Sequence, residues 1–275
     1  MKKQVLLIIL FYHVVTCFSQ SSNESFYVFK KDWTPAKDME SATYFMHEVV
    51  ENDTTYVCRF YNKTGPMVKL ETYQDSSLKI PHGTWAWYNT NGDIDSVGEF
   101  SMGKKDKYWR YGINANGGMR ISEEYQSGSL IKKINYITKK IMSNGTESDL
   151  NDSSLVVSLP YPSKMPNLSM TDDRPSEFKN GGVSGWVQYL RDNLKTPNRF
   201  TLISGPRTSA TVLVEFLVNQ DGQVVNVLID HSREWSVDMA ALKIIKNSPP
   251  WFPARQGGRF VMYRHRQKLT FQVND

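Results

Sequence analysis

The feature that most constrains the fold is an alternating apolar stretch near the C-terminal end, Thr211–Val218. Its apolar side chains recur at every second position, which is typical of a strand with one buried face. Asn219–Gly222 follows and contains an Asp-Gly pair, which favours a tight turn because glycine accepts a positive φ. Val224–Ile229 is then expected to return as a second strand.

A helix and a last strand are expected to complete this unit. From Val237 onward, apolar residues recur at i, i+3, i+4, i+7 and i+8, which predicts one apolar helical face against the sheet. We expect Ser236 to cap this helix and Pro249-Pro250 to end it. Phe260–Val273 is predicted to be a long final strand, so the predicted order is β-β-α-β.

Further landmarks are spaced along the same stretch. They are Val214, Phe216, Asp221-Gly222, Ser232, Asp238, Ala240-Ala241-Leu242, Pro250-Trp251-x-Pro253-Ala254 and Gly257-Gly258. This run resembles the C-terminal domain of TonB-like proteins, especially those of Bacteroidetes. Phe178–Gly182 and a helix-like stretch, Val183–Leu194, match how that domain usually begins. We therefore assign residues 176–275 to a TonB C-terminal-like domain.

An internal repeat of about 25 residues precedes this unit. Its clearest copies are Gly83–Lys104 and Asp106–Gly128. Each copy has an aromatic strand, an Asn-Gly turn, a second strand that ends in an aromatic residue, and a glycine-containing turn. We predict stacked antiparallel hairpins over residues 26–138, and hence an α+β chain overall. The pattern resembles the MORN-like repeats of exported Bacteroidetes proteins.

The tryptophans of the repeat allow two interpretations. We expect Trp85, Trp87 and Trp109 to form a shared core, because aromatic stripes at this spacing are more often core than ligand surface. Binding of a glycan or another ligand is the alternative. Residues 26–50 are expected to form a strand and, over Ala36–Val50, a short helix that caps the first repeat.

The segment between the two predicted domains, residues 139–175, is expected to be a flexible linker. Asn144–Ser154 is polar with short side chains, and the following prolines favour an extended backbone. The segment lacks the long Pro/Lys/Glu run of a transducer that crosses the periplasm. This departure weakens a direct role in energy coupling.

Residues 1–19 have the features of an export signal. Lys2-Lys3 precedes an apolar run, Val5–Val15, and we expect cleavage after Ser19. The protein is then expected in the periplasm or cell envelope. Retention as a membrane anchor and lipidation at Cys17 are alternatives, although the apolar run is shorter than the roughly 20 residues that span a bilayer. After cleavage Cys58 is the only cysteine, so no internal disulfide is expected, and we predict that it is buried.

The composition and motifs indicate neither catalytic activity nor binding of a nucleic acid, a cofactor or a metal ion. A net charge of +5, from 33 basic and 28 acidic residues, is mild and comes without a nucleic-acid-binding motif. No nucleophile elbow or phosphate loop is present, so we predict neither an enzyme nor a cofactor. The histidines lack the spacing of metal ligands. They are His13, His47, His82, His231 and His265.

The final strand is the predicted binding site. A three-stranded sheet with one helix behind it leaves a strand edge to which an extended partner segment can add. The resemblance implies that the partner is the N-terminal segment of an outer-membrane TonB-dependent receptor, with inner-membrane motor proteins as further partners if the chain is anchored. We predict that Val261, Tyr263 and His265 lie near the pairing edge. The basic residues of this strand either attract an acidic partner or protect the edge from aggregation. They are Arg259, Arg264, His265, Arg266 and Lys268.

Two functions of different classes follow. The first is a component of TonB-dependent transport across the outer membrane. The second is a periplasmic protein-protein interaction module that couples no energy. The N-terminus separates them, because a pulling force has to come from the inner membrane.

Overall fold

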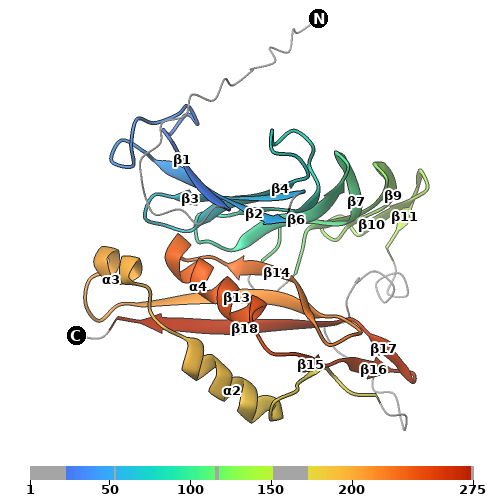
Figure 1. Ribbon diagram of the computed structural model, residues 1–275. Coiled ribbons are helices and arrows are strands. Elements are labelled where there is room, and N and C mark those ends of the chain that lie inside the picture. Colours follow the sequence, from blue (N-terminus) through green and yellow to red (C-terminus); the bar gives the residue numbers. More distant parts are fainter. Residues whose placement is uncertain (1–22, 53, 115–117, 151–172, 274–275) are drawn as a thin grey trace, which may run out of the picture.

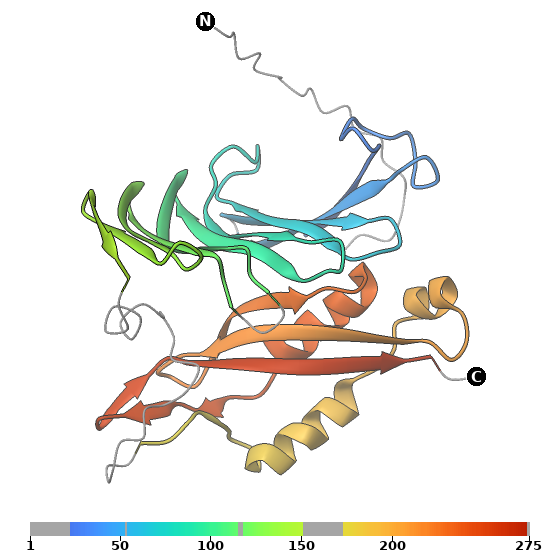
Figure 2. The ribbon, with the colours of Figure 1, turned by 180° about the vertical axis from the view of Figure 1, so that it is seen from behind.

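The computed structural model describes residues 23–52, 54–114, 118–150 and 173–273. The expected export signal and most of the expected linker lie outside these residues, as do His13 and Cys17. The described chain forms two layers, an N-terminal sheet and a C-terminal unit with helices, stacked as Figures 1 and 2 show.

The N-terminal layer is one sheet of 11 strands, in which each strand pairs with the strands before and after it in sequence. All these pairings are antiparallel, which confirms the predicted stack of hairpins. The strands are β1 (Glu24–Phe29), β2 (Tyr44–Asn52), β3 (Thr55–Asn62), β4 (Met67–Tyr73), β5 (Gly83–Tyr88), β6 (Ile94–Ser101), β7 (Lys104–Tyr111), β8 (Ile121–Gln126), β9 (Ser129–Asn135), β10 (Lys140–Ser143) and β11 (Thr146–Asp149).

The tryptophans of the repeat pack outside the core that the sheet shares with the C-terminal unit, whereas Tyr88 lies within that core. Trp109 is buried, and its ring centroid lies 5.0 Å from that of Phe100 and 6.1 Å from that of Trp87. Gly98 leaves room for it, because a Cβ there would lie 2.1 Å from Trp109 Cδ2. The tryptophans therefore pack on one another, as a shared core requires.

Two segments of the sheet differ from the sequence-based expectation. The helix expected over Ala36–Val50 is absent, and β2 occupies its second half. Pairing with both β1 and β3 supplies backbone hydrogen bonds that favour the strand. The expected flexible linker begins at residue 139, yet β10 and β11 extend the sheet through Asp149. Asn144 and Gly145 form the tight turn between them, both with positive φ.

The C-terminal unit contains a three-stranded antiparallel sheet in the order β14-β13-β18, so the β-β-α-β order is confirmed. The predicted final strand is interrupted at Met262, and α3 was not predicted. The elements are β12 (Glu177–Phe178), α2 (Gly182–Asn193), α3 (Asn198–Ser204), β13 (Ser209–Val218), β14 (Val224–His231), α4 (Trp235–Lys246), β15 (Trp251–Phe252), β16 (Ala254–Gln256), β17 (Arg259–Val261) and β18 (Tyr263–Gln272).

The N-terminus of α4 differs in detail from the prediction. The helix begins at Trp235, and Glu234 is its cap in place of Ser236. The Glu234 carboxylate accepts hydrogen bonds from the backbone N–H of Ser236, at 3.0 Å, and from its hydroxyl, at 2.6 Å. A carboxylate at this position also interacts favourably with the positive end of the helix dipole.

The two layers share one hydrophobic core. A single cluster of buried side chains contains Phe45, Tyr61 and Ile94 from the large sheet and Val237 and Leu242 from α4. In Figure 1 the large sheet lies over β14 and α4, while α2 lies at the opposite end of the unit. The relative position of the two layers is therefore fixed by burial of apolar surface.

Candidate partner-binding site

β18 is one edge of the three-stranded sheet. It pairs with β13 over its whole length, from Val218↔Tyr263 to Ser209↔Gln272, without a register shift. Within the described residues no second strand pairs with β18. One row of its backbone groups is therefore turned away from the sheet, which is the arrangement that strand addition requires.

The hydrogen-bonding phase of β18 shows which residues form that outer row. Val273 N–H donates to Thr208 O over 2.9 Å, and bonded pairs alternate with non-bonded pairs in an antiparallel ladder. Tyr263 and His265 therefore bond inward to β13. The outward N–H and C=O groups belong to Arg264, Arg266, Lys268, Thr270 and Gln272. In agreement, the C=O of Gln272 accepts a hydrogen bond from a side chain outside the sheet, the Thr196 hydroxyl, at 2.6 Å.

The three residues predicted near the pairing edge lie in different surroundings. Val261 is in β17 and pairs with Ala254 of β16, so it is outside β18. Tyr263 is the first residue of β18 and is half-buried. The His265 side chain points to the helix-covered face, where its ring centroid lies 5.2 Å from that of Phe216. Partner binding at these residues stays a prediction.

His265 does not contribute to the positive charge of β18 near neutral pH. Its Nε2 lies 2.5 Å from the Ser176 hydroxyl, and its ring packs against Trp251. Burial lowers the pKa of His265 to about 4, so the imidazole is neutral at pH 7. The basic character of this strand therefore comes from its arginines and from Lys268.

The arginines of β18 lie on the other face of the sheet. Arg264 forms an ion pair with Glu215 of β13, and Arg266 forms one with Asp230 of β14. Leu269 and Phe271 are buried on the helix side, so odd-numbered residues face the helices and even-numbered residues face away. The alternation of Leu269, Phe271 and Val273 with polar residues could have revealed this orientation in the sequence.

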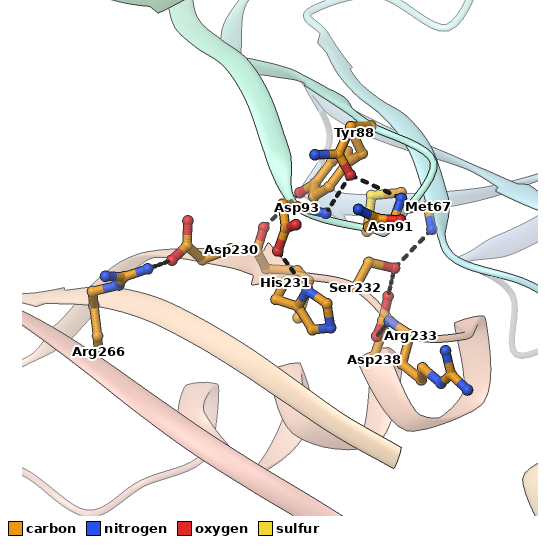
Figure 3. A network of polar contacts seen from close by, with 12 residues as sticks. Met67, Tyr88, Asn91, Asp93, Asp230, His231, Ser232, Arg233, Asp238 and Arg266 are labelled. Carbon is orange, nitrogen blue, oxygen red and sulfur yellow. Dashed lines mark hydrogen bonds and ion pairs between the residues drawn. The ribbon is translucent and has the colours of Figure 1, made fainter. Parts of the chain in front are cut away.

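The opposite edge, β14, is in contact with the large sheet (Figure 3). Ser232, directly after β14, donates its backbone N–H to Gly92 O at 2.7 Å, and its hydroxyl accepts from Met67 N–H at 2.7 Å. The Tyr88 hydroxyl donates to Ile229 O at 2.7 Å, and Asp93 pairs with a histidine of β14, His231. We call these contacts the seam; sequence reasoning noted Ser232 only as a landmark and did not find its role.

Gly92 lies in the turn between β5 and β6, and the seam depends on its lack of a side chain. Its φ is 89°, which favours glycine, and a Cβ there would lie 2.0 Å from Ser232 O. The glycine therefore serves two purposes, since it closes a hairpin of the repeat and allows the close approach of the C-terminal unit.

Asp238 is the buried acid behind the seam. Its side chain accepts hydrogen bonds from the Ser232 hydroxyl, at 2.5 Å, and from Arg233 N–H, at 3.0 Å. Burial raises the pKa of Asp238 to about 7, although these two hydrogen bonds oppose the shift. The protonation state of one carboxyl group thus affects the contact between the two layers.

The described residues contain no group of three or more His, Cys, Asp and Glu side chains that could hold a metal ion. Cys58 is a free, buried thiol, as expected, and burial raises its pKa well above the usual range, which makes it unreactive. None of the helices that the structure describes has the length and apolar character needed to cross a membrane.

The fold and the exposed edge define the C-terminal unit as a small α+β domain with one strand free for pairing. Residues 206–273 match the family described as Gram-negative bacterial TonB protein C-terminal, which supports a TonB C-terminal domain in this part of the chain. No curated protein matches the chain. Among solved structures, a mutant of S. aureus TarM in complex with Fondaparinux, alpha-GlcNAc-glycerol and UDP is similar at 14% identity, over 46% of this chain and 21% of that chain. Its TM-score of 0.21 is too low to support an argument.

Proposed function

We propose that this protein is a non-enzymatic cell-envelope protein that binds an extended partner segment by strand addition to β18, in TonB-dependent transport across the outer membrane. The observation that carries the proposal is the outer row of backbone groups on β18, in a domain that matches the TonB C-terminal family. The partner is the N-terminal segment of an outer-membrane TonB-dependent receptor, and the N-terminal hairpins are a MORN-like domain.

The outer row defines the test. Lys268→Pro removes one outward N–H donor at an exposed position, whereas Lys268→Ala removes the same charge and keeps the donor. Peptides from the N-terminal segments of TonB-dependent receptors of the same organism are titrated by fluorescence polarisation. We expect Lys268→Pro to weaken binding at least about tenfold relative to Lys268→Ala. Equal binding by two folded variants would exclude pairing at β18.

A second candidate function is a periplasmic interaction module that couples no energy. The seam favours it, because a C-terminal domain anchored on its own N-terminal sheet is not extended on a long spacer. The two functions differ in the N-terminus of the mature protein. Intact mass together with fractionation of native cells separates them: a protein that lacks residues 1–19 and is soluble is a module, and one that keeps them in the inner membrane is a transducer.

A further inference from the structure

A cavity of about 940 Å³ lies between the two layers. One wall is the face of the large sheet that carries Val57, Val97 and Arg110, and the other includes Leu217 of β13 with Arg264 of β18. The volume is in the upper part of the range for small-molecule sites, which is roughly 300–1,000 Å³. The cavity is distinct from the outer row of β18, because it lies against a face of the sheet and not along that edge.

Arg110 of β7 is the unusual residue of this cavity. It is half-buried, and its guanidinium makes no hydrogen bond or ion pair with any residue that the structure describes. Its electrostatic neighbours are the two ion pairs Arg264–Glu215 and Arg266–Asp230, whose charges already balance. Arg110 therefore adds one uncompensated positive charge to the cavity wall.

This charge is costly in the absence of a ligand. Burial and the neighbouring arginines lower the pKa of Arg110, which shows that its surroundings disfavour the charged form. A guanidinium presents five N–H donors in a planar arrangement that matches a carboxylate or phosphate. A partly desolvated arginine whose neighbouring carboxylates are already paired with other arginines has the physical properties of an empty anion-binding site.

Part of the remaining lining is apolar, beside charged residues that include Glu51 and Glu99. Val57, Leu70, Val97 and Leu217 line the same cavity as Arg110. These side chains offer apolar contact to the body of a ligand whose charged end is held by arginine. The apolar part of the lining, together with Arg110, therefore suits a molecule with one anionic group and an apolar body.

From these observations we infer that the cavity between the two layers binds an amphipathic organic anion, with Arg110 holding its carboxylate or phosphate group. The inference is independent of strand addition, since it needs neither a partner protein nor the outer row of β18. It also gives the N-terminal sheet a function beyond holding the C-terminal domain.

The test uses the full chain and decanoate as the probe, with 1-decanol as its uncharged counterpart. Isothermal titration calorimetry at submillimolar probe is run on the wild type, Arg110→Gln and Arg110→Lys. The control is Lys104→Gln, which removes one positive charge from an exposed position of the same strand outside the cavity. We expect decanoate to bind the wild type and Lys104→Gln alike, at least about tenfold more weakly to Arg110→Gln, and with partial recovery in Arg110→Lys.

Thermal unfolding is a second measurement that can contradict the inference. Without ligand, Arg110→Gln should have a Tm equal to or above that of the wild type, because it removes an uncompensated charge. Decanoate should raise the Tm of the wild type and not that of Arg110→Gln. Absence of decanoate binding, or equal binding by wild type and Arg110→Gln, overturns the inference, as does equal binding of decanol. None of these results alters the outcome of the Lys268 experiment on strand addition.

Discussion

The two edges of the C-terminal sheet are used differently. At β14, the large sheet contacts the strand end through the Tyr88 hydroxyl and the Gly92 carbonyl, and Ser232 joins both layers. At β18, no described strand pairs with the outward backbone groups, although the Gln272 carbonyl accepts from the Thr196 hydroxyl and the Lys268 carbonyl accepts from the Gln267 amide. Within the C-terminal sheet, the end of one edge is thus closed by internal assembly, whereas the other edge stays open to strand addition.

The largest loss in the free energy of unfolding is expected from a substitution at Gly92. In Gly92→Ala the added Cβ collides with Ser232 O in a backbone region that favours glycine, and we expect a loss of about 3 kcal/mol in the free energy of unfolding. Urea denaturation of the full chain measures it. Gly103→Ala is the control, because Gly103 also has positive φ but no atom within 4 Å of a Cβ, and it should cost about 1 kcal/mol. Equal losses would mean that the close approach at the seam contributes nothing.

The next effect concerns the hydroxyl that joins the layers. Ser232→Ala leaves Met67 N–H without its acceptor and Asp238 without one donor, and we expect a loss of about 2 kcal/mol by the same denaturation. Ser129→Ala, at an exposed position of the large sheet, should change stability by less than about 0.5 kcal/mol. A neutral Ser232→Ala would show that the seam is held by apolar burial alone.

Asp238 makes the seam dependent on pH. Its pKa is about 7 when folded and 3.8 ordinarily, so the folded chain binds more protons between these values and stability falls as pH rises from about 4 to about 7. The slope reaches at most about 1.4 kcal/mol per pH unit. His47 and His265, whose pKa burial lowers to about 4, act in the opposite direction. The difference between wild type and Asp238→Asn isolates the acid, and a difference that is flat over this range would refute the assignment.

A smaller effect is expected at the Tyr88 hydroxyl. Tyr88→Phe keeps the buried ring but removes the donor to Ile229 O, at a cost of about 1 kcal/mol. Tyr136→Phe, whose hydroxyl contacts only Ser122 within the large sheet, tests whether any loss is specific to the seam. Hydrogen exchange of the β14 amides, measured by mass spectrometry, should increase only in the Tyr88 variant.

The smallest effect is expected at the open edge. Lys268→Ala should change the free energy of unfolding by less than about 0.5 kcal/mol, because the exposed ammonium contributes no ion pair to the described structure. Denaturation in parallel with the Gly92 and Ser232 variants ranks the two edges directly. A large loss at Lys268 would mean that β18 is not an open edge but part of the folded assembly.

Local patterns in the sequence predicted most of the elements. Asn-Gly turns with flanking aromatic residues specify hairpins, and the stripe that begins at Val237 specifies a helix, because both depend on residues close in sequence. The helix predicted over Ala36–Val50 does not form. Strand pairing on both sides of β2 is more favourable there than a helix with only a weak apolar period. Contacts between the layers could not be predicted. Ser232 and Met67 are far apart in sequence, and neither residue alone indicates the other.

The predicted binding site stays a prediction, and the structure adds which residues of its strand turn their backbone groups outward. The final strand is an edge, but a one-residue change of phase decides whether a backbone N–H points inward or outward. His265 was grouped with the basic residues because of its type, whereas burial against Phe216 makes it neutral. The Arg110 guanidinium lacks an ion-pair partner among the described residues because the neighbouring carboxylates are paired with other arginines. This arrangement involves four strands, so no local sequence pattern predicts it.

The ten-residue length of β18 has a mechanical consequence. A strand that pairs along it would be held by a row of hydrogen bonds spread over about 34 Å, at roughly 3.4 Å per residue. A pull along the strand axis loads all of these bonds in shear, so they have to break together. A pull at right angles to the strand opens them one after another, as in unzipping. The open edge would therefore hold a tensioned partner most firmly when the force runs parallel to β18, and release it easily when the direction of pull turns.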